Sequence, residues 1–171
     1  RFTRQPFALA TIAVADTEPV ATPDFPPPAT AHVPNWSDTT DIPPRLTFKL
    51  DARAGGPFGI EWTINDQVMD HVHDTHDHGA PYTLPRAEWS KLRFENASYR
   101  LHPMHMHGLF FKVLARNGTP VDEPYFRDTV LVRPKETVDV GTVPLDAGRW
   151  MAHCHILEHA EAGMMTLVDV R

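Results

Sequence analysis

The sequence predicts an all-β fold, an antiparallel sandwich or barrel, over residues 45–171. About eight short segments in this range alternate apolar with polar side chains or are rich in β-branched and aromatic residues, and turn-forming residues separate them. The one segment that favours a helix is short, at 156–162. A chain of 171 residues, 42% of them hydrophobic, has room for one such domain with an appendage.

The predicted strands follow from the pattern of apolar residues. In the first two, alternation places Phe48 and Leu50, and then Phe58 and Trp62, on one face of a sheet. A later segment precedes Asn117-Gly118, a dipeptide typical of two-residue hairpin turns. The predicted strands are 46–50, 58–64, 89–94, 109–115, 129–132, 137–140, 148–153 and 165–170.

Residues 1–15 are predicted to be the last strand of a preceding domain. A signal peptide is the alternative, because basic residues precede an apolar stretch that ends in Ala13-Val14-Ala15. That stretch is short and contains a threonine, which favours the strand. Residues 16–44 hold eight of the 17 prolines, which leaves no room for a helix or a central strand and predicts a semi-rigid, extended linker.

Charge and cysteine content exclude several classes of function. The net charge is −6 and the pI is about 6.0, so the chain lacks the basic surface that binds nucleic acid or an anionic membrane. No apolar run approaches the roughly 20 residues of a membrane-spanning helix. With a single cysteine, the chain forms no internal disulfide.

The stretch His153-Cys154-His155, followed by His159 and Met164, contains that cysteine. One thiolate, imidazoles and a thioether form a soft, mixed ligand set, which suits a mononuclear blue-copper centre with a weak axial methionine. A buried apolar role is the commonest one for a lone cysteine, but the flanking histidines favour a metal ligand here.

Side chains alternate between the two faces of a strand. If residues 149–155 form a strand, Cys154 points to one side and both neighbouring histidines point to the other. The tripeptide is therefore predicted to hold one metal and to contribute to a second metal site on the opposite face, with a short covalent path between them.

A second histidine cluster lies in the segment 102–107. His105 and His107 are two residues apart and would share a face, whereas His102 is offset by three across Pro103. We expect His102 to face the same metal as the cysteine, and His105 and His107 to face the second site.

Together the two clusters resemble the copper-binding signatures of the multicopper oxidases, the family of laccases, spore-coat laccases and copper-efflux oxidases. The segments 62–65, 127–132 and 146–150 also resemble strands of that family. The resemblance covers about residues 45–171 and implies the last domain of such an oxidase. That domain would be a cupredoxin-like Greek-key β-sandwich or barrel with a short helix after the cysteine ligand.

The resemblance also implies a role for each ligand. The type 1 copper would be held by His102, Cys154, His159 and an axial Met164. His105 would bind the type 2 copper, and the type 3 pair would be bound by His107, His153 and His155. No cofactor other than copper is implied, with four copper ions in a complete enzyme.

In this family the type 1 copper takes single electrons from a phenol, an aromatic amine or a metal ion. The electrons would cross Cys154, His153 and His155 to a trinuclear cluster that reduces O2 to water. That cluster needs eight histidines, of which this domain would supply four. The others are expected from preceding cupredoxin domains, in the same longer chain or in a second polypeptide. The resemblance further implies a periplasmic or secreted protein, with its export signal upstream of Arg1.

There are three alternatives to this interpretation. A zinc site needs neither a methionine ten residues after the cysteine nor two outward histidines. A non-enzymatic blue-copper electron-transfer protein has no use for the histidines of the second face. A copper-storage or sensing module would instead use a histidine-rich segment earlier in the chain.

That histidine-rich segment spans residues 70–79, with three aspartates and His71, His73, His76 and His78. The favoured interpretation is a solvated polar loop. The alternative is an accessory loop that brings copper or another substrate metal near the type 1 site. Its two His-x-His pairs are not expected to complete the trinuclear cluster, because only two residues separate them.

Overall fold

A computed structural model describes residues 39, 41–69 and 82–171, which form two packed β-sheets and one short helix. The predicted strand at 1–15, most of the predicted linker at 16–44 and the histidine-rich segment 70–79 lie outside the described residues. Within the described residues, no helix is long and apolar enough to cross a membrane. The predicted β-sandwich is confirmed.

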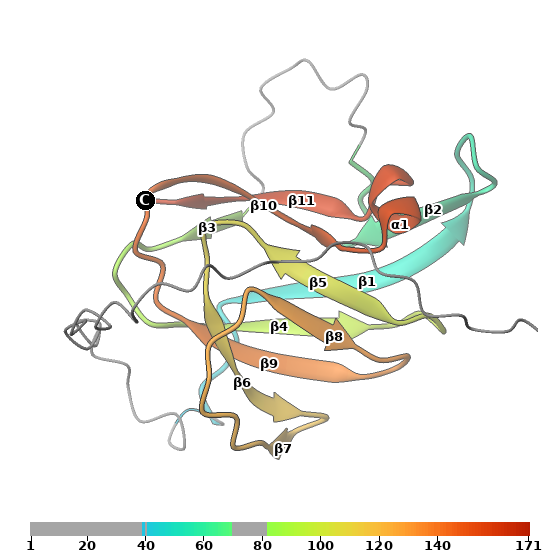
Figure 1. The fold of residues 1–171 in the computed structure, drawn as a ribbon. Coiled ribbons are helices and arrows are strands. Elements are labelled where there is room, and N and C mark those ends of the chain that lie inside the picture. The colour runs from blue at the N-terminus through green and yellow to red at the C-terminus, as the bar shows by residue number, and fades with distance from the viewer. Residues whose placement is uncertain (1–38, 40, 70–81) are drawn as a thin grey trace, which may run out of the picture. The chain divides into compact units, whose positions relative to one another are not determined.

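The first sheet has six strands (Figure 1). In their order across the sheet they are β2 (Ile60–Ile64), β1 (Leu46–Ala54), β4 (Ser90–Asn96), β9 (Thr137–Thr142), β6 (Phe111–Arg116) and β7 (Thr119–Pro120). The β1–β4 pair is parallel, and the other pairs are antiparallel. The β6–β7 hairpin turns at Asn117 and Gly118, with φ of 49° and 74°, as the Asn-Gly dipeptide predicts.

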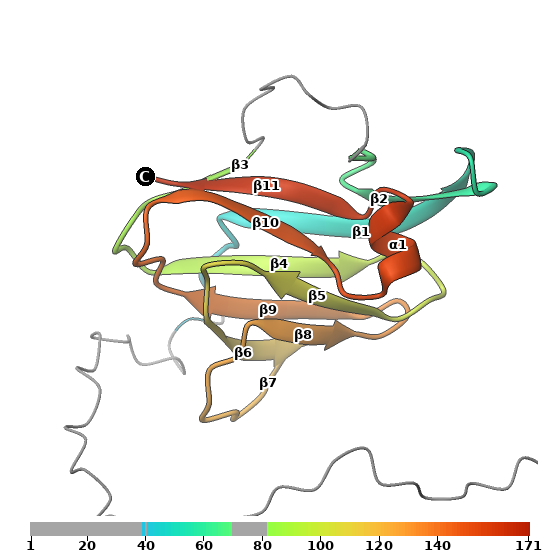
Figure 2. The same cartoon turned by 45° about the horizontal axis from the view of Figure 1, so that its top comes forward.

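The second sheet has five strands. In order they are β3 (Tyr82–Leu84), β11 (Met165–Val170), β10 (Gly148–Cys154), β5 (His102–Met106) and β8 (Thr129–Val132). The β3–β11 pair is parallel, and the others are antiparallel. The predicted helix after the cysteine is present as α1 (Leu157–Glu161), which contacts β10 and β2 at one end of the sandwich (Figure 2).

Alternating side chains from both sheets fill the space between them. Phe48 and Leu50 of β1 are fully buried, and the ring of Phe48 stacks on that of Phe94 in β4, with 5.4 Å between centroids. From the second sheet, Met104 and Met106 of β5 enter the same core. Burying one such side chain contributes roughly 1.5–3 kcal/mol, so the core holds β5 and its neighbours in a fixed register.

The structure differs from the predicted antiparallel arrangement in the β1–β4 and β3–β11 pairings, which are parallel. Parallel neighbours need a crossover connection rather than a hairpin, and side-chain alternation within a strand carries no information about its partner. The strands β3, β5 and β7 were not predicted. Two of them have three residues or fewer, and β5 contains no β-branched residue.

The prediction for residues 58–64 is wrong at its beginning. Phe58 is 68% exposed, and β2 begins only at Ile60. The N–H of Gly59 donates to the carbonyl oxygen of Gly56 at 3.2 Å, so the chain turns where the apolar alternation continues. Trp62, further along the same strand, is buried as predicted.

A buried ion-pair cluster lies on the outward side of the six-stranded sheet. Arg93 donates to both carboxylate oxygens of Asp139, at 2.7 and 2.9 Å, and the Nζ of Lys91 lies 3.4 Å from Asp139 Oδ2. Lys91 also donates to the carbonyl oxygen of Thr39 at 3.3 Å. Burial raises the pKa of Asp139, but the hydrogen bonds from Arg93 and the charge of Lys91 outweigh it and hold that pKa below its usual value.

Candidate metal centres

Cysteine and histidine side chains are gathered on β5 and β10, which pair antiparallel. In this register His105 lies opposite His153, and Met104 lies opposite Cys154. Because successive side chains alternate between faces, His105 and His153 leave the sheet on one face and Cys154 on the other.

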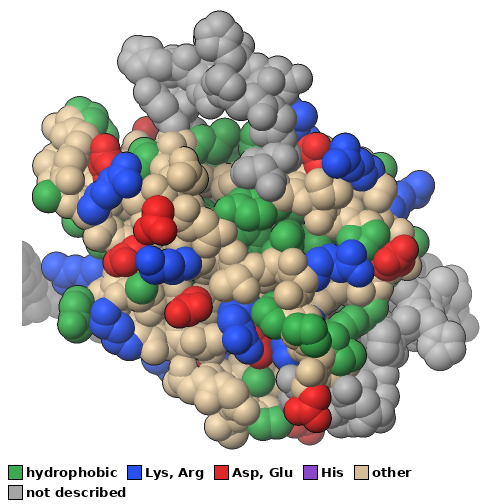
Figure 3. Space-filling view, turned by 180° about the vertical axis from the view of Figure 1, so that it is seen from behind, with side chains coloured by type: hydrophobic (Ala, Val, Ile, Leu, Met, Phe, Trp, Pro, Cys, Tyr) green, Lys and Arg blue, Asp and Glu red, His purple; other side chains and the backbone are tan. Residues whose placement is uncertain are grey.

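On the side of the domain seen in Figure 3, basic and acidic side chains are interspersed and no described histidine is visible.

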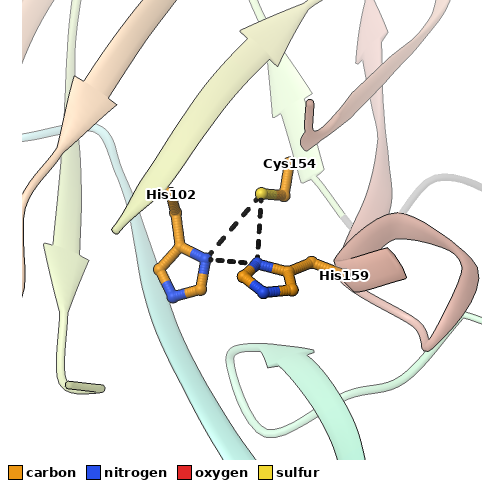
Figure 4. A group of neighbouring side chains, drawn as sticks. All are labelled: His102, Cys154 and His159. Atoms are coloured by element: carbon orange, nitrogen blue, oxygen red, sulfur yellow. Dashed lines mark hydrogen bonds between the residues drawn. The ribbon is translucent and has the colours of Figure 1, made fainter. Parts of the chain in front are cut away.

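The first group lies on the buried face and consists of His102 from β5, Cys154 from the end of β10 and His159 from α1 (Figure 4). We call it the buried His-Cys group. The Sγ of Cys154 lies 3.8 Å from the Nδ1 of His102 and 3.6 Å from the Nδ1 of His159, and the two Nδ1 atoms are 3.1 Å apart. His102 and Cys154 are fully buried, whereas His159 is partly buried.

These distances fit ligands of one metal ion. A metal bound at about 2.0 Å by nitrogen and at about 2.3 Å by sulfur holds its ligand atoms roughly 3.3–3.8 Å from one another. The two Sγ–Nδ1 distances, 3.8 and 3.6 Å, fall in this range, and the Nδ1–Nδ1 distance of 3.1 Å lies just below it. Two imidazoles and one thiolate are the donor set that suits blue copper, so the residues present fit this ion.

Burial sets the protonation of the group. It raises the pKa of Cys154 to about 11. It lowers the pKa of His102 to about 4, with the neighbouring His159 acting in the same direction, and it also lowers the pKa of His159. Near pH 7 both imidazoles are therefore neutral and offer a lone pair, and the thiol exchanges its proton for the metal on binding.

Two further residues, Trp62 and Met164, lie beside the group. The indole ring of Trp62 stacks on the imidazole of His159, with 3.9 Å between centroids and 28° between planes, and meets the ring of His102 edge-on at 5.3 Å. Met164 is fully buried; its N–H donates to the carbonyl oxygen of His159 at 2.9 Å, and its carbonyl oxygen accepts from the N–H of Cys154 at 3.1 Å. These main-chain bonds fix Met164 next to two residues of the group.

The second group lies on the opposite face and consists of His105, His107, His153 and His155, which we call the outer histidine group. The ligand atoms of the first three lie within 4.8 Å of one another, and the Nε2 atoms of His107 and His153 are 3.1 Å apart. The ring centroid of His155 lies 5.9 Å from that of His153 and 5.7 Å from that of His105. Burial lowers the pKa of His107, and the charges of His105 and His155 add to the effect.

Hydrogen bonds at Nδ1 determine which ring nitrogen remains for a metal. The Nδ1 of His105 lies 3.1 Å from the carbonyl oxygen of Asp128 and 3.0 Å from the Oγ1 of Thr129. The Nδ1 of His153 lies 2.9 Å from the carbonyl oxygen of Cys154. A carbonyl oxygen only accepts, so both Nδ1 atoms carry the proton and donate it. The lone pair of each neutral ring is therefore on Nε2.

The turn after β5 positions His107. Its N–H donates to the carbonyl oxygen of Met151 at 2.9 Å. The next residue, Gly108, has a φ of 63°, and a Cβ at this position would lie 2.3 Å from the indole ring of Trp150. Only glycine combines this backbone conformation with such a close approach, so Gly108 allows His107 to join the outer histidine group.

A cavity of about 520 Å³ lies beside His159. Its wall is mainly apolar and is formed by Trp62, Tyr99, Leu101, Pro134 and Ile156, with Arg100 and Glu158 as the charged residues. His159 borders the cavity and also belongs to the buried His-Cys group. A molecule held in the cavity therefore lies next to a residue of that group.

The described domain matches a family model for multicopper oxidases over residues 41–171. The chain belongs to the multicopper oxidase family. Membership implies a copper cofactor and favours copper over zinc in the buried His-Cys group.

This multicopper oxidase chain is similar to proteins from bacteria and fungi. It is 31% identical to the multicopper oxidase MmcO of Mycobacterium tuberculosis over 127 residues, which are 74% of this chain and 23% of that protein. It is 34% identical to a laccase of Pycnoporus cinnabarinus over 134 residues, again covering 74% of this chain and 23% of the relative. The chain therefore spans about a quarter of the length of these two relatives, 23% in each case.

Solved structures of multicopper oxidases share the fold. The structure of the enzyme from Pseudomonas thermotolerans matches with a TM-score of 0.60 and 28% identity, over 73% of this chain and 29% of that one. McoA from Aquifex aeolicus matches with a TM-score of 0.60 and 25% identity, over 77% and 30%. Together with the two-sheet topology, these matches identify a cupredoxin-like β-sandwich.

The structure brings seven of the eight predicted ligands of this multicopper oxidase domain together in two groups, three residues in one and four in the other. The eighth, Met164, is joined to the first group by main-chain hydrogen bonds. Assignment of each residue to a copper type stays a prediction. The accessory loop with His71, His73, His76 and His78 lies outside the described residues. Trp62 was not expected beside His159, because sequence spacing does not relate β2 to α1.

Proposed function

We propose that residues 45–171 are the C-terminal domain of a multicopper oxidase, in which they accept electrons from a reducing substrate for the reduction of O2 to water. Copper, when bound, supplies the one-electron chemistry. The observation that carries this proposal is that Cys154 and His153, adjacent on β10, belong to separate ligand groups on opposite faces of one sheet. A periplasmic or secreted location is part of the proposal.

We assign the type 1 copper to His102, Cys154 and His159, with Met164 as the weak axial ligand. The convergence of two Nδ1 atoms on one Sγ supports this assignment. So does the burial of His102, Cys154 and Met164, which keeps water away from the metal. Neutral imidazoles and a thiolate are the protonation states that this ion requires.

We assign the type 2 copper to His105 and the type 3 pair to His107, His153 and His155. The unprotonated Nε2 atoms of His105 and His153 support these roles. His107 and His155 are exposed, so the group is open on one side. We expect four more histidines to approach from that side, supplied by preceding cupredoxin domains in a longer chain or in a second polypeptide. The 23% share of the relatives' length that this chain spans agrees with such a partner.

Cys154 connects the two groups through its own main chain. Its peptide bonds lead to His153 and His155, and the Nδ1 of His153 donates a hydrogen bond to the carbonyl oxygen of Cys154 at 2.9 Å. Both routes lead from the buried His-Cys group to the outer histidine group. A simple blue-copper carrier would need the buried group alone, so the outer histidine group favours an oxidase.

We propose a phenol or an aromatic amine, rather than a metal ion, as the reducing substrate. The cavity beside His159 offers apolar and aromatic walls, which suit a flat organic ring. A metal ion would need several carboxylate, imidazole or thioether ligands. The lining of the cavity provides two such groups, Glu158 and His159, which are fewer than a metal-ion site usually needs.

Copper-loaded protein of known polypeptide composition tests the oxidase assignment. Cys154→Ser should abolish the blue absorption and the oxidation of a phenol. His105→Ala, on the other face, should retain the blue absorption and lose O2 reduction. A blue Cys154→Ser variant would disprove the type 1 assignment, and O2 uptake by His105→Ala at the wild-type rate would disprove the role of the outer histidine group.

Steady-state kinetics of the complete enzyme test the substrate class. Leu101→Asp places a charge in the cavity wall and should raise the KM for a neutral phenol about tenfold, which corresponds to about 1.4 kcal/mol. The KM for O2 should not change, because we expect O2 to react at the outer histidine group. A kcat/KM higher for a metal ion than for every phenol and aromatic amine tested would show that the substrate class is wrong.

A further inference from the structure

A chain of buried hydrogen bonds holds His102 on the side of its ring that faces away from Cys154. The Nε2 of His102 lies 2.8 Å from the Oγ of Ser98, and that Oγ lies 2.8 Å from the Oδ1 of Asn96. All three side chains are buried, with exposures of 0, 5 and 2%, respectively. Asn96 ends β4, Ser98 lies in the following loop, and His102 begins β5.

The main chain determines which way the amide of Asn96 points. Its Nδ2 lies 2.7 Å from the carbonyl oxygen of Arg100, 2.9 Å from that of Arg133 and 3.3 Å from that of Val132. Because carbonyl oxygens only accept, the NH2 group must face them and Oδ1 must face Ser98. The N–H of Ser98, which only donates, lies 2.9 Å from this Oδ1, in agreement with that orientation.

The orientation of Asn96 in turn directs the hydroxyl proton of Ser98. The hydroxyl has one proton, and Asn96 Oδ1 at 2.8 Å is its nearest carbonyl acceptor, followed by the carbonyl oxygen of Arg100 at 3.2 Å. Either acceptor uses the proton that His102 would otherwise receive. The Oγ lone pairs then accept from the N–H of Arg100, at 3.1 Å, and from the Nε2–H of His102.

We propose that Ser98, oriented by Asn96, is a positioning residue that keeps the proton of the His102 ring on Nε2 and so leaves the Nδ1 lone pair for the metal. A neutral imidazole carries one proton, so a protonated Nε2 means an unprotonated Nδ1. That Nδ1 faces the Sγ of Cys154 and the Nδ1 of His159, at 3.8 and 3.1 Å. The ring therefore has the ligating tautomer and orientation before a metal binds.

The identity of that metal as the type 1 copper rests on the proposed function, but the tautomer does not. A group that hydrogen-bonds to the second ring nitrogen of a metal-binding histidine fixes the orientation of that ring. Loss of such a group typically lowers metal affinity about 10–100-fold. Ser98 and Asn96 are buried and hydrogen-bonded to the main chain of three separate residues. These hydrogen bonds hold the Oγ of Ser98 in a fixed position next to His102.

Nitrogen NMR of the wild-type chain tests the tautomer directly. The full 171-residue chain, metal-free and labelled with ¹⁵N, should show His102 protonated on Nε2 alone. A spectrum in which Nδ1 carries the proton, or in which both tautomers exchange, would overturn the proposal. This measurement needs no variant and therefore does not depend on whether a variant folds.

Copper binding by three variants tests the positioning role. Ser98→Ala removes the acceptor, Ser98→Thr retains it, and Ser90→Ala is the matched control. Ser90 is 1% exposed on β4, and its Oγ has no hydrogen-bond partner within the described residues. Ser98→Ala should lose copper to a chelator at least about tenfold faster than wild type and alter the copper EPR spectrum. Ser98→Thr and Ser90→Ala should stay within about threefold of wild type.

The outcomes separate this inference from the proposed function. If wild-type protein binds no copper at the buried His-Cys group, the proposed function fails while the NMR result still decides the tautomer. If wild type binds copper and Ser98→Ala releases it at the same rate with an unchanged EPR spectrum, the positioning role is wrong and the proposed function stands.

Discussion

The indole ring of Trp62 lies nearly parallel to the imidazole ring of His159, with 3.9 Å between their centroids. Trp62 comes from β2 in the six-stranded sheet, whereas His159 comes from α1, which follows β10 of the other sheet. The stack therefore joins the two sheets at the buried His-Cys group. It covers one face of the imidazole, and the cavity borders the same residue.

Replacing Trp62 should destabilise the domain and loosen the copper site together. Trp62→Ala removes a side chain that is 7% exposed and leaves a cavity. It should lower the free energy of unfolding by about 3–5 kcal/mol. It should also speed the loss of copper to a chelator, because His159 loses its stacking partner. Urea unfolding and chelator kinetics measure the two effects. Phe58→Ala, at a position 68% exposed, should change stability by no more than about 0.5 kcal/mol; equal losses in both variants would contradict the role of the stack.

Gly108 lies in the turn beside the outer histidine group, and Gly118, in the β6–β7 hairpin, provides a matched control position. Both have positive φ, 63° and 74°, so alanine costs about 1 kcal/mol of backbone strain at either position. At Gly108 the added Cβ also meets Trp150 at 2.3 Å, whereas nothing lies within 4 Å at Gly118. We expect Gly108→Ala to lose about 3 kcal/mol and Gly118→Ala about 1 kcal/mol in urea unfolding. Similar losses would show that the close contact with Trp150 is relieved without cost.

Asp139 should be the most sensitive carboxylate of the six-stranded sheet. Asp139→Asn removes the charge that faces the buried Lys91 and accepts two hydrogen bonds from Arg93. The loss of one member of a buried ion pair costs about 3–5 kcal/mol. Asp169→Asn is the control, because its pair with Arg149 is partly exposed and such pairs contribute about 0–1 kcal/mol. Thermal unfolding of both variants measures the difference, and a control that loses as much would refute the role of burial.

The same carboxylate predicts a dependence of stability on pH. Burial by itself raises the pKa of Asp139. The hydrogen bonds from Arg93 and the charge of Lys91 lower it by a larger amount, so the folded-state pKa lies below the unfolded value of about 4. A lowered pKa in the folded state contributes stability above the unfolded pKa, and this contribution is lost as the pH falls through the folded pKa. The stability difference between wild type and Asp139→Asn should therefore be constant above about pH 5 and should shrink below about pH 4. Urea unfolding at pH 7, 4 and 3 measures it, and a difference unchanged at pH 3 would contradict the prediction.

Strands with a regular pattern were predictable, and their partners were not. The bounds predicted for β8 and β11 match the structure, because β-branched and alternating residues fill both strands. The parallel partners of β1 and β3 could not be predicted, since the pattern within a strand reports which face is buried and not which strand lies beside it. Phe58 was misplaced for a related reason: the apolar alternation continues into a turn that a main-chain hydrogen bond closes.

The two faces of the site were predictable because side-chain alternation is a property of the backbone. The opposite orientation of Cys154 and His153 follows from their adjacency on one strand. The support from Ser98 was not predictable, because the direction of its hydrogen bond depends on carbonyl groups that three separate residues bring to Asn96. These contacts exist only once β4, β5 and the turn after β8 are assembled.

The position of β11 between β3 and β10 has a consequence for the order in which the domain is made. Residues 165–170 are the last strand along the chain, yet they lie inside the second sheet and pair with residues 82–84 on one side and 148–153 on the other. During synthesis, β3 has no strand to pair with, and one side of β10 stays unpaired, until residues 165–170 leave the ribosome. The contacts between β3 and β11 join residues 82–84 to 168–170, and contacts this far apart in sequence form slowly. The second sheet, which carries residues of the buried His-Cys group and of the outer histidine group, therefore cannot be complete until residue 170 has left the ribosome.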